Sequence, residues 1–437
     1  MKAEKQKPNQ SAGSIEMRSV KFFLPESEDR VDPGYNFETD SYCEKRVRGS
    51  DHDVYAHELF DAPQCDGLLV TRSGVSADRH EKIRQAGGIH RYLRFPSEFL
   101  IIADCGAFQY RDEEVPPYSC EETCEFYEDL KFDYGISLDH MIFEFDPEYD
   151  EGRSLLLKTP SPEMERRFRL TLDNAKKMHR LCASKNYAFK LIGAVQGWSP
   201  HSYLRGIQEL VNAGVTYLAL GGLAKATDLQ IRSVLDVIGP FVIESGVELH
   251  ILGVARLSLL PDYQRANVVS CDSASTILQA FKSNKDNFHT REKKYTAVRI
   301  PPATGDLSPK VRKLLKQVES SDGSDAAAKL HRKLINLEEK ALASLRSYAV
   351  HKLSLDEAMK ELTAYEDEFG DERRYYPLFE ETLKERPWCS CTCAICQKIG
   401  IEVIILRGNN RNRRRGFHNT HVFFEQFKEL RDQLALA

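Results

Sequence analysis

The chain has 437 residues, a hydrophobic content of 41%, a charged content of 29% and a formal net charge of −5. These values are typical of a globular protein and argue against a generally basic nucleic-acid binder, so any nucleic-acid contact must come from a local patch. No apolar run approaches the roughly 20 residues that a membrane helix needs, which predicts a protein without membrane contact.

The first segment, residues 1–19, begins MKAEKQKPNQSAGS and is polar. Because it lacks the hydrophobic core of a secretory signal, we expect a disordered tail and a cytoplasmic protein. The eleven cysteines are odd in number and unevenly spread, and four of them fall between Cys389 and Cys396. Such close spacing favours a metal site over a disulfide framework and predicts a reducing compartment.

Short apolar runs alternate with helical stretches in residues 20–286. Strand–helix alternation implies a parallel sheet, and about eight strands over roughly 260 residues predict a (β/α)8 barrel. The alternative, an open doubly wound sheet, lacks a supporting GxGxxG turn. The expected strands are Phe22–Pro25, Gly67–Thr71, Phe99–Ala103, Tyr134–Leu138, Phe189–Val195, Tyr217–Leu220, Leu249–Val254 and Val268–Ser270. Helical periodicity is clearest in Ser161–Lys185, Ser199–Ala213 and Leu229–Ile238.

Two further units follow the expected barrel. Residues 287–387 predict a helical insertion, with helices near Pro309–Val318, Ala326–Val350 and Ser354–Phe369 and a flexible linker at Glu319–Ala326. A solvated helical spacer is the default interpretation of this insertion. Residues 388–437 carry the clustered cysteines, a strand-like Glu402–Leu406, a basic run and a final amphipathic helix.

Polar groups recur where the expected strands end. In a parallel α/β barrel these ends meet at one mouth, where loops leave room for a ligand. Three carboxylates, two carboxamides, one aromatic ring and a glycine backbone edge suit a flat heterocycle such as a purine. The residues are Asp104, Phe108, Gln109, Asp139, Gln196, the Gly221–Gly222 pair and Asp272. The alternative for each residue is a polar barrel-layer or capping role, and Asp272 in particular suits a helix N-cap.

The motifs at these strand ends resemble those of the tRNA-guanine transglycosylase superfamily. ADCGAFQ is similar to its DSGGFQ-type motif, AVQG to VQGG, LALGGLA to IGGLA, LGVA to MGVG, and CDSAS to its nucleophile motif. They occur in the family's order over Phe99–Ser275, and a CxCxxC with a downstream His-Asn resembles the family's zinc motif. The resemblance implies the barrel fold and a base-exchange reaction.

The resemblance also assigns roles to individual residues. Asp272 matches the nucleophile, and Asp104 matches a second active-site aspartate that assists proton transfer. Phe108 and Leu252 match the pair that sandwiches the base, and Leu223 matches a pocket-edge position near the 7-substituent. Asp139, Gln196 and Gly222 match the readers of the base edge, although SLDH departs from the family's usual surroundings at Asp139.

The implied metal site is a structural zinc ion, one per chain, held by Cys391, Cys393, Cys396 and His418. His421, one helical turn further, is the alternative fourth ligand, and Cys389 is a spare thiol. Between the cysteines and His418 lies the basic run 407–415. In place of a solvated loop, we expect the run to contact nucleic-acid phosphates through Arg411, Arg413, Arg414 and Arg415.

Outside the pocket, the stretches VDPGYNFETD and YTAVRIPP make the chain most similar to the DpdA branch, DNA-guanine transglycosylases that insert 7-deazaguanine derivatives such as preQ0 into DNA. DNA is further favoured because no Pro-Thr-Arg follows Asp272 and no appended RNA-binding domain is evident. The alternatives are a tRNA-guanine transglycosylase and a non-catalytic nucleic-acid-binding subunit, and the presence of Asp272 and Asp104 argues against the second. A helper protein of the same modification system is a further expected partner.

Overall fold

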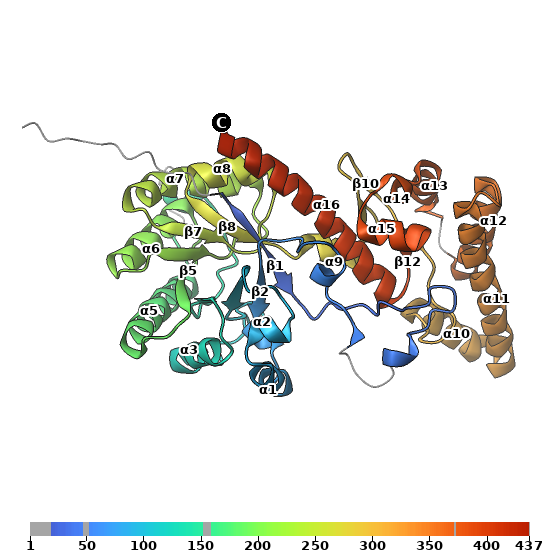
Figure 1. The fold of residues 1–437 in the computed structure, drawn as a ribbon, viewed down its shortest axis with the longest axis horizontal. Coiled ribbons are helices and arrows are strands. Elements are labelled where there is room, and N and C mark those ends of the chain that lie inside the picture. Colours follow the sequence, from blue (N-terminus) through green and yellow to red (C-terminus); the bar gives the residue numbers. More distant parts are fainter. Residues whose placement is uncertain (1–18, 47–51, 152–158, 371–372, 437) are drawn as a thin grey trace, which may run out of the picture.

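The computed structural model describes residues 19–46, 52–151, 159–370 and 373–436, and the expected tail lies outside this range except for its last residue. Eight parallel strands form a closed barrel in sequence order, because β1 pairs with both β2 and β8 (Figure 1). The strands are β1 (Lys21–Glu26), β2 (Gly67–Thr71), β3 (Leu100–Asp104), β4 (Tyr134–Ile136), β5 (Lys190–Val195), β6 (Tyr217–Leu220), β7 (Glu248–Ile251) and β8 (Val268–Asp272). The predicted barrel is confirmed, and the open sheet is excluded.

The barrel interior is a packed core. Side chains from neighbouring strands meet there, among them Phe23, Leu69, Ile102, Ile136, Ile192, Ala194 and Ala219. The opposite faces of the strands pack against the surrounding helices, so most strand residues are buried on one side or the other. Burial on both faces explains why the strands read as continuous apolar runs rather than alternating ones.

Helices surround the barrel between successive strands. They are α1 (Ala77–Ala86), α2 (Ile89–Tyr92), α3 (Cys120–Asp129), α4 (Glu148–Glu151), α5 (Pro162–Lys185), α6 (Pro200–Asn212), α7 (Asp228–Ser245), α8 (Leu260–Arg265) and α9 (Ser275–Lys282). The start of α5 follows from its sequence: the Ser161 side chain accepts a hydrogen bond from the Met164 N–H, and Pro162 occupies the first turn.

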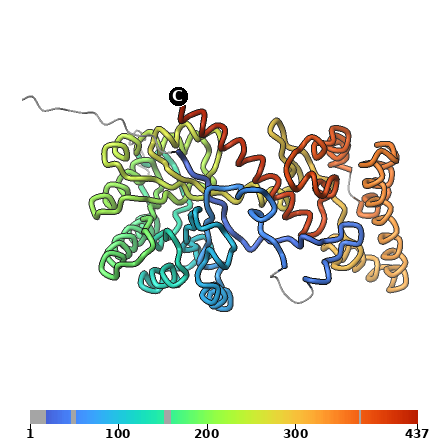
Figure 2. The backbone as a smooth tube through the Cα atoms, viewed as in Figure 1, coloured from blue at the N-terminus to red at the C-terminus, as the bar shows by residue number. Residues whose placement is uncertain are grey.

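A second lobe lies beside the barrel (Figures 1 and 2). Its helices are α10 (Pro309–Asp322), α11 (Ser324–Ala349), α12 (Leu355–Glu366), α13 (Tyr376–Glu385), α14 (Pro387–Ser390) and α15 (Ala394–Ile399). Short strands join its parts: β9 (Phe288–His289) pairs with β10 (Lys294–Tyr295), and β11 (Val298–Arg299) pairs with β12 (Ile405–Leu406). β11 precedes the helical segment and β12 follows the cysteines, so their pairing hydrogen-bonds these two parts of the lobe to each other.

Two local predictions in this lobe are wrong. The expected linker Glu319–Ala326 is helical except at Gly323. This single residue, with a φ of +89°, separates α10 from α11 and changes the direction of the chain. The expected strand Glu402–Leu406 is mostly a 3-10 turn over Gly400–Ile404, and strand pairing is limited to β12. In contrast, the predicted capping box of Ser354 and Glu357 is present at the start of α12.

The last helix, α16 (Gly408–Leu436), runs from the second lobe along the outside of the barrel (Figure 1). Its aromatic side chains cover Phe22 of β1, with ring centroids 5.0 Å away for Phe423 and 5.8 Å for Phe427. The Arg431 guanidinium donates to the carboxylate of Asp66 at 3.0 Å. The helix thereby attaches the second lobe to the barrel wall. None of the described helices is both long enough and apolar enough to cross a bilayer.

Candidate active site and metal-binding cluster

Asp272 ends β8 and is 5% exposed at the mouth of the barrel. Its Oδ1 accepts hydrogen bonds from the backbone N–H of Gly253 at 2.9 Å and from Nε2 of His250 at 3.1 Å. The following helix, α9, has Ala274 at its N-cap and no side-chain cap, so the capping interpretation of Asp272 is wrong. The carboxylate is held by one oxygen and turned away from the helix start.

Asp104 ends β3 and is half-buried. Burial raises the pKa of this carboxyl from 3.8 to about 7, and the nearby charges of Asp139 and Asp272 add to the effect. The Gly106 N–H donates to the carboxylate at 3.2 Å and opposes the shift. A carboxyl with a pKa near neutrality can both donate and accept a proton at physiological pH.

A buried polar network surrounds Asp139, just beyond the end of β4. Its two carboxylate oxygens accept hydrogen bonds from Nε2 of Gln196 at 2.5 Å and from the thiol of Cys105 at 2.9 Å. The Tyr110 hydroxyl lies 3.1 Å from both the Cys105 sulfur and the Asp139 carbonyl. Burial raises the pKa of the Asp139 carboxyl. The structure therefore brings together the two side chains that the sequence assigns to the base edge.

The glycine pair after β6 lies against the same network. A Cβ atom on Gly221 would lie 2.2 Å from Nε2 of Gln196, and Gly222 has a φ of +82°. A side chain at either position would displace Gln196 or strain the backbone. The pair thus leaves room for the Gln196 carboxamide, and the role of Gly222 at the base edge stays a prediction.

The remaining predicted pocket residues differ in how the structure places them. Phe108 is 56% exposed, with the Arg111 guanidinium 4.5 Å from its ring, and Gln109 is exposed on the same turn. Leu252 packs against the barrel-interior cluster below the mouth. The side chain of Leu223 is fully buried in the main hydrophobic core, so the prediction that it forms the pocket edge is corrected to a core-packing role.

Sequence reasoning missed two buried polar residues under the mouth, His250 and Ser270. Nδ1 of His250 lies 2.5 Å from the Ser270 hydroxyl, and its Nε2 reaches Asp272. The signal for them was the two-residue period of a strand: His250 precedes Leu252 by two positions, and Ser270 precedes Asp272 by two. Residues at i and i+2 face the same side, so both had to point into the barrel.

Three cysteines and one histidine of the second lobe form a candidate metal site. The thiol sulfurs of Cys391, Cys393 and Cys396 lie 3.7, 3.4 and 3.4 Å from Nδ1 of His418. A tetrahedral zinc with bonds of ~2.3 Å to sulfur and ~2.0 Å to nitrogen requires sulfur–nitrogen separations of about 3.5 Å, so the four atoms fit such an ion. Nε2 of His418 hydrogen-bonds the His289 carbonyl at 2.8 Å, which directs the Nδ1 lone pair toward the thiols.

The alternative ligands lie outside this cluster. Nδ1 of His421 is 2.6 Å from Oε1 of Gln64, and its ring stacks on Phe60. Cys389 is exposed and is not part of the group of four. Next to His418, the Asn419 carboxamide donates to the Thr276 carbonyl at 3.3 Å, which connects the cluster to the start of α9, four residues after Asp272. The cluster thus supports the helix that follows Asp272.

The basic run after the cysteines is part of α16 rather than a loop. Arg411 is 1% exposed and donates to the Glu402 carboxylate at 2.7 Å, to the Phe37 carbonyl at 2.8 Å and to Asp40. Arg414 donates to the Asp32 carbonyl at 2.8 Å. Buried guanidinium groups need such hydrogen-bond partners, and these two arginines find them in the segment between β1 and β2, which they thereby hold in place.

The prediction of phosphate contacts by this run is therefore wrong for Arg411, Arg414 and Arg415. Arg415 is fully buried and donates to the carbonyls of Ala280 and Val403 at 2.6 and 3.0 Å. Arg413 is half-buried and paired with Asp29 at 3.1 Å. Arg411 and Arg414 are the two that hold the segment VDPGYNFETD, through Phe37, Asp40 and Asp32.

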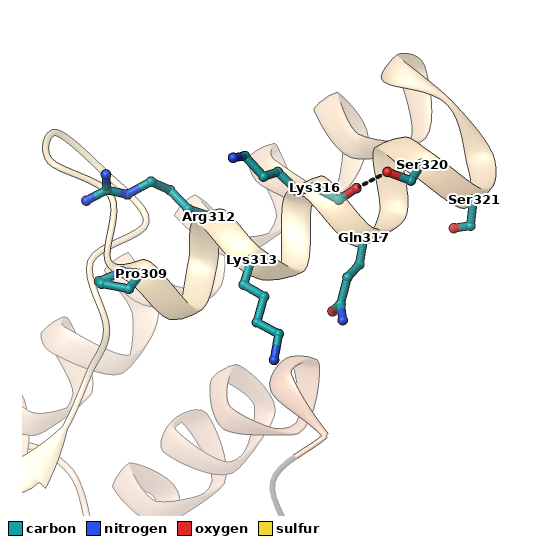
Figure 3. A pocket seen from close by; sticks show the side chains of 7 residues that line it. All are labelled: Pro309, Arg312, Lys313, Lys316, Gln317, Ser320 and Ser321. Carbon is teal, nitrogen blue, oxygen red and sulfur yellow. Dashed lines mark hydrogen bonds between the residues drawn. The ribbon is translucent and has the colours of Figure 1, made fainter.

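Exposed basic side chains occur elsewhere. A groove of about 640 Å³ lies next to Asp272, lined by Gly253 and Ser273 and by the cations Arg256, Arg291, Lys293 and Lys294. Three of these cations are paired with carboxylates that do not line the groove: Arg256 with Asp228, Arg291 with Glu429, and Lys293 with Glu381 and Glu385. A second basic surface lies on α10, where Arg312, Lys313 and Lys316 are exposed (Figure 3). Figure 3 shows Arg312 and Lys316 projecting to one side of α10 and Lys313 to another, so these cations are spread over the helix surface rather than directed into one enclosed site.

The chain combines carboxylates at one barrel mouth with a Cys3His cluster, and its similarity to a curated relative places it in the tRNA-guanine transglycosylase superfamily. No family model matches the chain. It is 36% identical over 425 residues to the DNA-guanine transglycosylase of Salmonella montevideo, and the match covers 94% of this chain and 97% of that protein. The chain therefore belongs to the DNA-guanine transglycosylase family.

The raised pKa of Asp104 predicts a pH-dependent effect on stability. Its pKa is 3.8 when unperturbed and about 7 in the fold, so ionisation opposes folding; the penalty is absent below pH 4 and complete above pH 7. Asp104→Asn should therefore raise the Tm at pH 8 and leave it nearly unchanged at pH 4, as measured by calorimetry. Asp112→Asn, at an exposed carboxyl, is the control. Equal Tm changes for Asp104→Asn at both pH values would contradict this prediction.

Proposed function

We propose that this protein replaces guanine in DNA with a 7-deazaguanine base of the preQ0 type, through a covalent glycosyl-enzyme on Asp272. The observation that carries the proposal is the arrangement of Asp272. One oxygen, Oδ1, is fixed by two donors, and among the described residues no hydrogen bond is made to the other, Oδ2. The family relationship supports the same reaction, because the relative is named a DNA-guanine transglycosylase.

In the first half-reaction, Oδ2 of Asp272 attacks C1′ of the target nucleotide and the bond from C1′ to N9 of guanine breaks. The electron pair of that bond stays on guanine, which receives a proton from the neutral carboxyl of Asp104. A substantial fraction of Asp104 is neutral near pH 7 because its pKa is about 7. The target base must first leave the stack, which costs a few kcal/mol in a duplex.

In the second half-reaction, N9 of the incoming base attacks C1′, the Asp272 carboxylate leaves, and the N9 proton passes to Asp104. Two displacements at C1′ retain its configuration. Esterification of Asp272 removes one of the charges that raise the pKa of Asp104. Asp104 is therefore a stronger acid after the first step, and its ionised form is ready to accept a proton in the second.

The buried network provides base recognition. Asp139 and Gln196 offer a carboxylate and a carboxamide to the N–H and C=O groups of a purine-like edge, and Gly222 offers backbone. Phe108 and Leu252 are proposed to pack against the two faces of the base. The Cys105 thiol holds one oxygen of Asp139 and so fixes its orientation.

The groove beside Asp272 is the proposed path of the DNA strand, in place of the buried arginine run. It begins at Ser273, next to the nucleophile, and Lys294 along it has no carboxylate partner among the described residues. Strand phosphates flanking a flipped nucleotide must pass close to the reactive carbon, so a basic groove at this position suits them. The cytoplasmic location and the helper protein stay predictions.

The ion proposed for the Cys3His cluster is a structural zinc. Three thiolates and one imidazole in a closed tetrahedral arrangement are typical of zinc that stabilises a fold. When bound, the ion would fix Cys391, Cys393, Cys396 and His418 and, through Asn419, the start of α9.

Labelled preQ0 should enter duplex DNA when incubated with the protein, and nucleoside mass spectrometry should locate it at former guanine positions. Asp272→Asn should lower the exchange rate by several orders of magnitude while DNA binding persists, because the shape of the side chain is kept and the nucleophile is lost. Label in tRNA with none in DNA, tested with cell extract to supply any helper, would move the assignment to tRNA. Full exchange by Asp272→Asn would exclude this nucleophile.

Lys294→Ala should weaken DNA binding several-fold and lower the salt dependence of log K by about 0.9, the value for one phosphate contact. Fluorescence anisotropy at several salt concentrations measures both quantities. Lys313→Ala on α10 is the matched control, since it removes the same charge outside the groove. Weaker binding by Lys313→Ala together with unchanged binding by Lys294→Ala would place the DNA on α10 instead.

Metal analysis should find one zinc per chain, and Cys393→Ser should lose it and lower the Tm. Cys389→Ser, at the exposed thiol outside the cluster, should keep both the metal and the stability. Wild-type protein that is folded and active without zinc would contradict the structural role of the metal.

A further inference from the structure

A continuous series of hydrogen bonds crosses the barrel interior beneath Asp272. The Tyr217 hydroxyl on β6 lies 2.5 Å from the Ser270 hydroxyl on β8, which lies 2.5 Å from Nδ1 of His250 on β7. Nε2 of His250 then reaches Oδ1 of Asp272 at 3.1 Å. His250 is fully buried and Ser270 is 1% exposed, so bulk water does not supply these partners.

The donors and acceptors of this series fit one direction. A carboxylate at Asp272 can only accept, so Nε2 of His250 carries a proton. In the Nε2–H tautomer that we assign below, Nδ1 accepts from the Ser270 hydroxyl, whereas a ring protonated at both nitrogens would donate to Ser270 instead. The Ser270 oxygen in turn accepts from Tyr217, whose pKa is raised by burial and which therefore stays protonated. In this arrangement each hydroxyl proton is used once and every acceptor is filled.

We propose that His250 is a positioning residue: the Tyr217–Ser270 pair fixes its Nε2–H tautomer, and this proton selects Oδ2 of Asp272 as the attacking oxygen. The inference rests on the proposed transglycosylase function. Nε2 of His250 and the Gly253 N–H both occupy Oδ1, so Oδ2 is the oxygen left to reach C1′.

The same two donors act again when the intermediate breaks down. In the glycosyl-enzyme, Oδ1 is the ester carbonyl oxygen, and it gains negative charge as the bond between Oδ2 and C1′ breaks. Donors already placed at that oxygen stabilise the departing carboxylate without rearrangement. His250 is therefore expected to affect the rate of both displacements and to have little effect on the affinity for the incoming base.

Two other roles for these residues fit the geometry less well. A Ser–His–Asp hydrolase needs an accessible serine, whereas Ser270 is buried below His250 and faces Tyr217. A purely packing histidine would need only its ring contact with Phe23, at 6.1 Å between centroids. Packing alone would be served better by an apolar side chain of similar size, which has no polar atoms to bury. Both ring nitrogens of His250 are instead hydrogen-bonded, which indicates a role beyond packing.

The kinetic test compares two substitutions of His250. His250→Leu removes the donor and should lower kcat by about 10²-fold, the usual loss for one preorganised donor, with little change in the KM for the incoming base. His250→Gln can place an amide N–H near the position of Nε2 and should recover most of that loss. Wild-type kcat in His250→Leu, or no recovery in His250→Gln while both variants keep a wild-type Tm, would overturn the proposal.

The spectroscopic test does not depend on turnover. ¹⁵N NMR of histidine-labelled protein should show the His250 proton on Nε2 in the wild type, with His250→Gln identifying the resonance. Ser270→Ala removes the donor to Nδ1 and should shift the proton partly to Nδ1, together with a smaller loss of kcat. A proton on Nδ1 in the wild type would overturn the proposal. Absence of base exchange by the wild-type protein would contradict the proposed function. The NMR measurement does not require turnover, so the two failures can be told apart.

Discussion

Three carboxylates held at one end of a closed barrel repel one another, and the rest of the site is arranged around that repulsion. Parallel strands end at the same rim, so Asp104, Asp139 and Asp272 cannot avoid each other once they follow β3, β4 and β8. Each is handled differently. Asp272 is stabilised by two donors, Asp139 receives a thiol and a carboxamide, and Asp104 is left with a raised pKa.

Different surroundings thus give three chemically identical side chains distinct roles. In the proposed reaction, the carboxylate with donors on one oxygen is the nucleophile of fixed orientation, and the one enclosed by hydrogen bonds recognises the base. Asp104 has a pKa raised to about 7 despite a hydrogen bond from the Gly106 N–H, and it is the proposed carrier of the proton. The arrangement has a cost in stability, because burying charge at the rim opposes folding. The barrel core beneath the rim and the helices around it offset that cost.

The second lobe reaches the active site through α16 and the metal-binding cluster. The buried arginines of α16 hold the segment between β1 and β2, while Asn419 holds the start of α9 behind Asp272. The arginines of this run hold parts of the protein together in its interior, which explains why a basic sequence produces no basic surface there. Guanidinium groups with several fixed donors suit such a role because one side chain can join carbonyls from different segments.

The sequence by itself determined the eight strands, their closure into a barrel, the three carboxylates at the rim and the cysteine spacing. These features depend on local patterns: apolar runs, caps, and residues a fixed number of positions apart. Only the tertiary structure decided which side of a helix the arginines face, that Leu223 joins the core, that His418 rather than His421 meets the thiols, and that His250 on β7 hydrogen-bonds Asp272 on β8. Those outcomes depend on contacts between segments up to 411 residues apart, such as Arg431 with the Val20 carbonyl, and no local pattern encodes them.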